Sequence, residues 1–186
     1  MIPIESMDIE WALMQRIGSG SVACPRFTPT AWWECDVAEL TSAGYLVEFE
    51  IKMSRSDFWR DSKKSGYVRE DPNDWKTSKR TTKHELCASG HKRAPNRFYF
   101  AAPEGLLSVE DIPSWAGLIE VGRYREIDWP HCTVLKRAPL LHKEKRVPLG
   151  QHIGQVLCGR AIHMWSQQYF RRANARSSRL AAARPA

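Results

Sequence analysis

Within residues 45–53, YLVEFEIKM, apolar and charged side chains alternate from Val47 to Met53, and this pattern constrains the fold most strongly. The odd positions are all large and apolar, while Glu48, Glu50 and Lys52 occupy even positions. A period of two predicts a β-strand, because successive side chains of a strand point to opposite faces of its sheet. The unbroken apolar face indicates a central strand rather than a marginal one.

A second strand is predicted just before it, in residues 31–40, AWWECDVAEL. The intervening residues 41–44, TSAG, suit a short turn, so the two segments together predict a β-hairpin. Asp36 lies on the first strand, and Glu50 and Lys52 lie on the second. Their side chains can meet on one face of the hairpin if the strand register allows it.

Helices are expected on both sides of this hairpin. The first spans residues 6–17, where apolar residues recur at helical spacing and Ser6 or Asp8 can cap the start. The next begins at Ser54 or Ser56. Further helices are expected at 79–89 and 149–175, and strands at 96–103, 116–124 and 132–141. Loops are expected from residue 69 and over 104–115, the second of them with one helical turn.

These elements predict an α/β or α+β fold with a mixed central sheet of four to five strands flanked by helices. At 186 residues, the chain is long enough for one domain with a sizeable core. We expect residues 1–150 to form the main domain. Residues 151–186 are expected to form a basic helix and tail that pack on it or extend from it.

The charge of the chain suggests a polyanionic partner. The formal net charge is +7, and no acid follows Glu144, whereas basic residues continue to the end. A second basic cluster lies in residues 74–84. Such blocks suit phosphate contacts, although net charge alone does not separate nucleic acid from a membrane surface or from simple solubility. The last dozen residues read better as a solvated tail.

No apolar run is long enough to cross a membrane, and residues 1–11 carry acids where a secretory signal would carry basic residues. We therefore expect a cytoplasmic protein with no membrane association. The five cysteines are scattered and odd in number, which favours free thiols.

The hairpin carries the residues of a metal-dependent active site. Two carboxylates converging from adjacent strands can bind a hard cation such as Mg²⁺. Lys52 lies two residues beyond Glu50, about 7 Å further along the strand. There its ammonium can hold a metal-bound water or stabilise charge on a phosphate. The competing interpretation is an amphipathic hairpin with one solvated face, because alternating Glu and Lys is common on surface strands.

The segment DVAELTSAGYLVEFEIKMSRSDF, residues 36–58, resembles the core of the PD-(D/E)XK nuclease superfamily. That family places an acid on one strand and (D/E)-x-K on the next, here Asp36 and then Glu50-Ile51-Lys52. Residues 50–61, 95–107 and 112–121 are also similar to MmcB-like DNA repair proteins and phage or prophage nucleases of this superfamily. The resemblance covers roughly residues 30–122, and its most specific part is the acid followed by E-x-K.

The resemblance implies a restriction-endonuclease-like fold and a Mg²⁺ or Mn²⁺ cofactor. Asp36 and Glu50 would be metal ligands, the carbonyl of Ile51 a third ligand, and Lys52 the catalytic lysine. Many members also place a glutamate of the first helix near the metal, and here Glu10 fits best, with Glu5 as the alternative.

The sequence departs from the family pattern before the first acid, where Cys35 replaces the nominal proline. Glu39 can compete with Asp36 as the first acid, but it has the opposite strand parity. Glu48 is either a supporting acid near the metal or a solvent-facing residue.

Basic residues after the hairpin are candidates for phosphate contacts. They are Arg55, Lys63, Lys64, Lys79, Arg80, Lys83 and His84. For His84 alone, a surface or hydrogen-bonded structural role is the better interpretation. Asp57 and Asp61 are interpreted as capping and fold-stabilising residues.

The sequence therefore predicts a Mg²⁺-dependent deoxyribonuclease of phage or DNA-repair type, with DNA as partner. Many nucleases of this fold act as dimers, although no oligomer signal is visible in the sequence. Two other classes remain open: a non-catalytic nucleic-acid-binding protein that keeps the fold, and a protein-interaction module such as a phage inhibitor.

Overall fold

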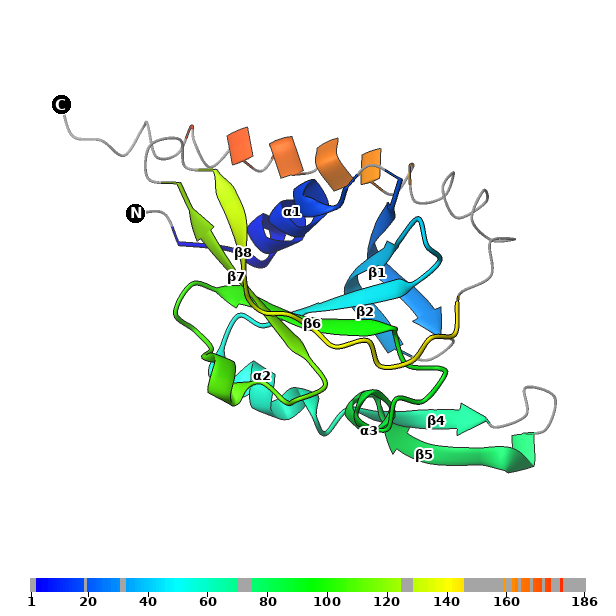
Figure 1. Ribbon diagram of the computed structural model, residues 1–186. Helices are drawn as coiled ribbons and strands as arrows, with labels where there is room; N and C mark the ends of the chain where they lie inside the picture. Colours follow the sequence, from blue (N-terminus) through cyan, green and yellow to red (C-terminus); the bar gives the residue numbers. More distant parts are fainter. Residues whose placement is uncertain are drawn as a thin grey trace. The chain divides into compact units, whose positions relative to one another are not determined.

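The computed structural model describes residues 3–18, 20–30, 33–69, 75–124 and 129–145, together with isolated positions and short runs between 159 and 178. The chain divides into two compact units, residues 1–147 and 148–186. The first contains all the regular elements discussed below (Figure 1). In the second, the described positions are helical, and all but Ser178 lie within residues 149–175, where the sequence predicts a helix.

Six strands form one mixed sheet in the order β1-β2-β3-β6-β7-β8. The strands are β1 (Val22–Thr30), β2 (Trp33–Leu40), β3 (Leu46–Ile51), β6 (Arg97–Pro103), β7 (Gly117–Arg123) and β8 (Pro130–Lys136). β6 runs parallel to both β3 and β7, and the other neighbours are antiparallel. The mixed α/β architecture is confirmed, but the central sheet has more strands than the four to five predicted.

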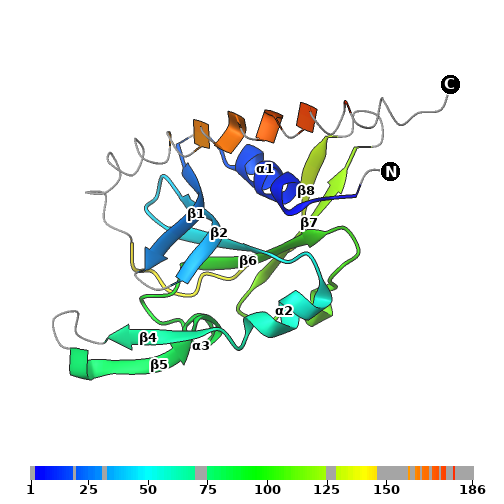
Figure 2. The same ribbon diagram turned by 180° about the vertical axis from the view of Figure 1, so that it is seen from behind.

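Helices cover both faces of this sheet. Helix α1 (Ser6–Arg16) packs on one face, where Ile9 and Leu13 join Val37, Phe49 and other buried residues. Helices α2 (Arg55–Asp61) and α3 (Lys83–Ala88) cover the opposite face, as the two views from front and back show (Figures 1 and 2). The sheet is therefore the middle layer, and its central strands are shielded from solvent on both sides.

Burial of β3 contradicts the interpretation of its charged face as a solvated surface. Only 2% of Glu48, 6% of Glu50 and 1% of Lys52 is exposed. The sequence correctly places β3 in the sheet centre, and β2 pairs with it as the predicted hairpin. Because a central strand is covered on both faces, its charged residues have to find partners inside the protein.

Strand β1 was not predicted, because its sequence, VACPRFTPT, contains two prolines. Proline lacks the amide proton that a central strand donates, so prolines argue against a strand assignment. β1 is an edge strand, with β2 as its only sheet neighbour in the described region. The edge position tolerates Pro25, and the β1–β2 register shifts between Phe27 and Thr30.

The predicted helix over residues 79–89 is wrong in its first half. The segment forms strand β5 (Ser78–Thr82) and then helix α3, which Thr82 caps by accepting a hydrogen bond from the amide of Glu85. β5 pairs with β4 (Ser65–Arg69) in a two-stranded antiparallel sheet. Lys79 and Arg80 therefore lie on a strand. β5 also occupies part of the segment after residue 69 that was predicted to be a loop.

The side chain of Asn96 ties three segments together and was not singled out in the sequence. Its Oδ1 accepts a hydrogen bond of 2.8 Å from the amide of Leu46, at the start of β3. Its Nδ2 donates to the carbonyls of His142 and Glu144 at 3.0 and 2.8 Å. Asn96 is completely buried, so it fixes the segment after β8 against the beginning of the central strand.

The other elements agree with their predicted positions, including α1, α2 and the helical turn η2 (Val109–Asp111). Glu5 is the N-cap residue of α1, and its amide donates to the Asp8 carboxylate, so the predicted cap at Ser6 or Asp8 was one or more residues late. Ser54 caps α2 through the amide of Asp57. Within the described part of the chain, no helix combines the length and apolar character needed to span a membrane.

Candidate functional site

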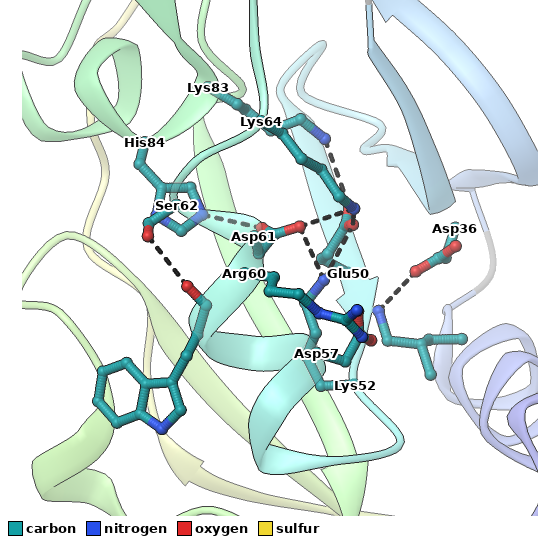
Figure 3. Close-up of polar contacts among 12 residues, drawn as sticks. Asp36, Glu50, Lys52, Asp57, Arg60, Asp61, Ser62, Lys64, Lys83 and His84 are labelled. Atoms are coloured by element: carbon teal, nitrogen blue, oxygen red, sulfur yellow. Dashed lines mark hydrogen bonds and ion pairs between the residues drawn. The ribbon is translucent and has the colours of Figure 1, made fainter.

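The E-x-K residues of β3 lie at the centre of a buried charged cluster (Figure 3). Nζ of Lys52 is 3.2 Å from Oε1 of Glu50 and 2.8 Å from Oδ1 of Asp61. The amide of Lys52 also donates to the carbonyl of Ala101 on β6, which fixes the backbone at the strand end. The ammonium of Lys52 is thus held between two carboxylates, and its side chain is buried.

Asp61, the last residue of α2, connects most of this cluster. Its Oδ1 accepts from Lys52 and from Lys64, both at 2.8 Å, and its Oδ2 is 2.8 Å from Nε2 of His84. Burial works against ionisation, but hydrogen bonds from His84 and Lys52 outweigh it and hold the pKa of Asp61 well below its ordinary range. The carboxylate is therefore ionised at neutral pH.

The interpretation of Asp61 as a helix cap is wrong, because it ends α2 and the cap is Ser54. A fold-stabilising role fits its buried contacts, and those contacts also bring it into the site. The sequence signal that could have placed Asp61 on the buried face of α2 was its spacing from Phe58, since residues three apart lie on the same helix face. Both residues are buried, whereas Asp57 is only partly buried in the first turn.

Two further lysines neutralise the glutamates of β3. Lys64 lies 3.3 Å from Oε1 of Glu50, and Lys83 lies 3.3 Å from Oε2 of the same residue. Lys83 also lies 3.3 Å from Oε2 of Glu48. Burial would lower the pKa of Lys83, but the charges of Glu48 and Glu50 outweigh it and raise the pKa above its ordinary value. Glu48 is thus a buried partner of Lys83 and does not face solvent.

His84 is hydrogen-bonded and packed, as its structural interpretation predicted. Its Nε2 bonds Asp61, and its ring meets Trp115 edge-on, with the ring centroids 5.0 Å apart. Phe98 and Phe100 are also in edge contact with the ring. The apolar neighbours fix the orientation of the imidazole toward Asp61.

Asp36 lies where the β2–β3 ladder ends. Pairing runs from Leu40 and Leu46 to Val37 and Phe49, and the next contact is made by the Asp36 side chain. Its Oδ2 accepts a hydrogen bond of 2.6 Å from the amide of Ile51 (Figure 3). The structure therefore places Asp36 beside the E-x-K segment, on the side opposite Asp61.

Burial and the neighbouring charge of Glu50 raise the pKa of Asp36 to about 6, and Glu10 adds to this effect. Glu10 is a buried residue of α1, and its Oε1 is 3.8 Å from the guanidinium of Arg26. The charges of Glu50 and Glu10 thus both disfavour the ionised form of Asp36. Such an excess of negative charge is what a bound cation would relieve.

The donor set suits a hard cation, because all three acids offer oxygen atoms only. Among the residues that the structure describes, no group of three or more His, Cys, Asp or Glu side chains is arranged to hold a metal ion. Mg²⁺ commonly uses one or two carboxylates and keeps several waters. Asp36 and Glu50, with the carbonyl of Ile51, are the ligands that the sequence resemblance implies for such an ion.

The other predicted phosphate ligands lie outside this cluster. Arg55 forms a two-pronged contact with the carboxylate of Asp111, at 2.8 and 3.1 Å. Lys63 is exposed just after α2, and Lys79 and Arg80 are exposed on β5. Of the seven basic candidates, the structure thus brings three into the cluster: Lys64, Lys83 and His84.

Replacement of Asp36 by Asn should stabilise the protein in a pH-dependent way. Because its pKa rises from 3.8 to about 6 on folding, ionised Asp36 opposes folding above pH 6. Asp36→Asn keeps an oxygen for the Ile51 amide and should raise the free energy of unfolding by about 1–3 kcal/mol at pH 8 without divalent metal. The gain should fade between pH 6 and 4, where the wild-type carboxyl becomes protonated.

Urea unfolding of both proteins in EDTA, at pH 8 and at pH 4, measures this difference. An equal or lower stability of Asp36→Asn at pH 8 would contradict the inferred charge excess. Glu39→Gln is a matched control, since Glu39 lies on the same strand and outside the cluster, and it should leave stability nearly unchanged at both pH values.

Comparisons with known proteins place this chain in no characterised family. No protein-family model and no curated protein sequence matches it. A solved structure, described as the SPO1766 protein of unknown function from Silicibacter pomeroyi, is similar at a TM-score of 0.46 with 18% sequence identity. The match covers 97% of this chain and 92% of the other.

Proposed function

We propose that this protein is a metal-dependent nuclease with a restriction-endonuclease-like core that hydrolyses phosphodiester bonds in DNA. The observation that carries the proposal is the placement of Glu50 and Lys52, both buried, on the central strand, with Asp36 on the adjacent strand bonded to Ile51 between them. This is the acid and E-x-K arrangement that the sequence resembles. Glu50 and Lys52 are buried and Asp36 is half-buried, and an acid–acid–lysine set so far removed from solvent is costly to maintain and is common at functional sites.

Each residue has a distinct role in the proposed reaction. A divalent cation held by Asp36 and Glu50 would polarise the scissile phosphate and promote ionisation of water. Lys52 provides a fixed ammonium that orients the attacking water or stabilises the negative charge that grows on the phosphate. Asp61 fixes that ammonium at 2.8 Å, so its position is set before substrate binds.

The surrounding basic residues suit a polyanionic substrate. Lys64 is 56% exposed at its side chain while touching the cluster, and Lys63, Lys79 and Arg80 are exposed on adjoining elements. Phosphate contacts of this kind supply binding without sequence preference. The excess of positive charge over the whole chain, +7, supports the same substrate class.

The proposal is tested by incubating the purified protein with single-stranded and double-stranded DNA in Mg²⁺, in Mn²⁺ and in EDTA. Cleavage should require the metal, and Glu50→Gln should reduce it by about 10²–10³-fold because a metal ligand loses its charge. Glu39→Gln should cleave like the parent. Equal cleavage by Glu50→Gln and the parent would reject the proposal.

A non-catalytic nucleic-acid-binding role is the second candidate, and one observation favours it. Both carboxylate oxygens of Glu50 already contact ammonium groups, from Lys52, Lys64 and Lys83. A cluster neutralised by lysines is internally satisfied without metal. Calorimetric titration with Mn²⁺ separates the two candidates, because a binding module would give no heat that depends on Asp36 and Glu50.

A further inference from the structure

Two ammonium groups contact the same pair of carboxylate oxygens in the cluster. Lys52 and Lys64 both lie within 3.3 Å of Oε1 of Glu50, and both lie 2.8 Å from Oδ1 of Asp61. A cation that takes Oε1 of Glu50 as a ligand therefore has to displace one of the two lysines, because like charges repel strongly in a partly desolvated site.

Burial indicates which of the lysines can leave. The Lys52 side chain is 1% exposed and the Lys83 side chain 11%, whereas that of Lys64 is 56% exposed. An exposed ion pair contributes little to stability, so Lys64 can move into solvent at small cost. Lys52 has no such path, since its ammonium lies between two buried carboxylates.

The backbone at Lys64 is anchored, whereas its ion-paired side chain reaches solvent. The amide of Lys64 donates to the carbonyl of Asp61 at 3.1 Å, and β4 begins at the next residue. Its flexible four-carbon stem lets the ammonium shift by several ångströms with the backbone fixed. A released ammonium at this position would lie at the exposed edge of the cluster, where a DNA phosphate would approach.

We infer that Lys64 is an exchangeable counter-ion, which neutralises Glu50 and Asp61 in the metal-free protein and is displaced to a DNA phosphate when a divalent cation binds. The inference rests on the proposed nuclease function and adds to it a link between metal binding and substrate binding. The exchange keeps the negative charge of Glu50 balanced in both states. The Lys64 ammonium balances it in the metal-free protein, and the divalent cation balances it in the metal-bound protein.

The first test is calorimetric titration with Mn²⁺ alone, without DNA. Lys64→Met removes the competing charge and should bind Mn²⁺ about tenfold more tightly than the parent. Lys63→Met is the matched control, because it removes the same charge from an exposed neighbour outside the cluster. It should stay within about twofold of the parent, since solvent and salt screen the charge of an exposed lysine.

The second test measures DNA binding by fluorescence anisotropy of a labelled oligonucleotide, in Ca²⁺ and in EDTA. Ca²⁺ takes oxygen ligands and serves as the cation. Lys64→Met should weaken DNA binding several-fold in Ca²⁺ and should have little effect in EDTA, where the lysine is held by the carboxylates. An equal loss in both conditions would overturn the exchange.

The outcomes distinguish this inference from the proposed function. One outcome is that the parent binds Mn²⁺, Asp36→Asn does not, and Lys64→Met binds Mn²⁺ with the affinity of the parent. This outcome supports the metal site and rejects the exchange. If none of these proteins binds Mn²⁺, both the metal site and the exchange are rejected. Tighter binding by Lys64→Met than by Lys63→Met supports the exchange.

Discussion

Replacement of Lys52 by Met should nearly abolish DNA cleavage while leaving metal binding intact. Lys52 is the most deeply buried charged residue of the site, and its ammonium has a fixed position between Glu50 and Asp61. Loss of a positioned acid–base or charge-stabilising group costs about 10²–10⁴-fold in rate. Met retains the length and apolar stem of the lysine, so the packing around the stem is conserved.

Metal affinity separates a catalytic defect from a folding defect in this variant. Lys52→Met removes a positive charge beside Glu50, so Mn²⁺ binding measured by calorimetry should be unchanged or tighter. Circular dichroism should show a folded protein, and Lys92→Met, which changes an exposed lysine on the turn after α3, should cleave normally. Full activity of a folded Lys52→Met protein would remove this lysine from the mechanism.

Replacement of Asp61 by Ala should cause the largest loss of stability. The variant would leave the buried ammonium of Lys52 with Glu50 as its remaining close acid, and it would remove the hydrogen-bond partner of His84. Breaking a buried charge pair by removing one partner costs about 3–5 kcal/mol. Urea unfolding at pH 7 measures this loss, and cleavage should fall with it because Lys52 is no longer held in place.

Asp57→Ala is the matched control, since Asp57 lies on the same short helix and carries the same charge. Its effect should be limited to the helix dipole, about 0.3–1 kcal/mol. A similar loss for the two variants would contradict the central position assigned to Asp61.

At acid pH, the difference in free energy of unfolding between the Asp61→Ala variant and the parent should become smaller. Asp61 has a depressed pKa in the folded protein, so its contribution to stability is fully present above its ordinary value of 3.8. The contribution decreases progressively as pH falls below that value toward the much lower pKa of Asp61 in the folded protein. The stability difference should therefore be constant from pH 7 to about pH 5 and should decrease below pH 4. A stability difference that does not decrease at all between pH 4 and pH 2 would assign the effect to packing alone.

The central hairpin could be predicted because its information is local. Period-two alternation specifies a strand, and a four-residue turn places the next strand beside it, so β2 and β3 follow from short segments of sequence. The same pattern indicates that Glu50 and Lys52 share a face with one another. It does not say whether solvent or protein covers that face, because burial depends on segments elsewhere in the chain.

The errors in the fold arose where tertiary position overrides local preference. The prolines of β1 are tolerated because no strand lies on its outer side within the described sheet. Residues 79–82 were assigned to a helix, although Thr81 and Thr82 are β-branched and Thr82 can cap the helix that follows. The pairing of β4 with β5 was therefore missed.

By itself, the sequence determined the central strand, the hairpin partner that carries Asp36, and the E-x-K pair. Tertiary structure alone decided which residues surround that pair in the buried cluster. They are Asp61 from α2, Lys64 from the segment after α2, and Lys83 with His84 from α3. The physical reason is that charges buried on a central strand have to be neutralised, and their partners are chosen by proximity in space. Residues 14 and 33 positions away meet Glu50 because α2 and α3 cover the same face of the sheet.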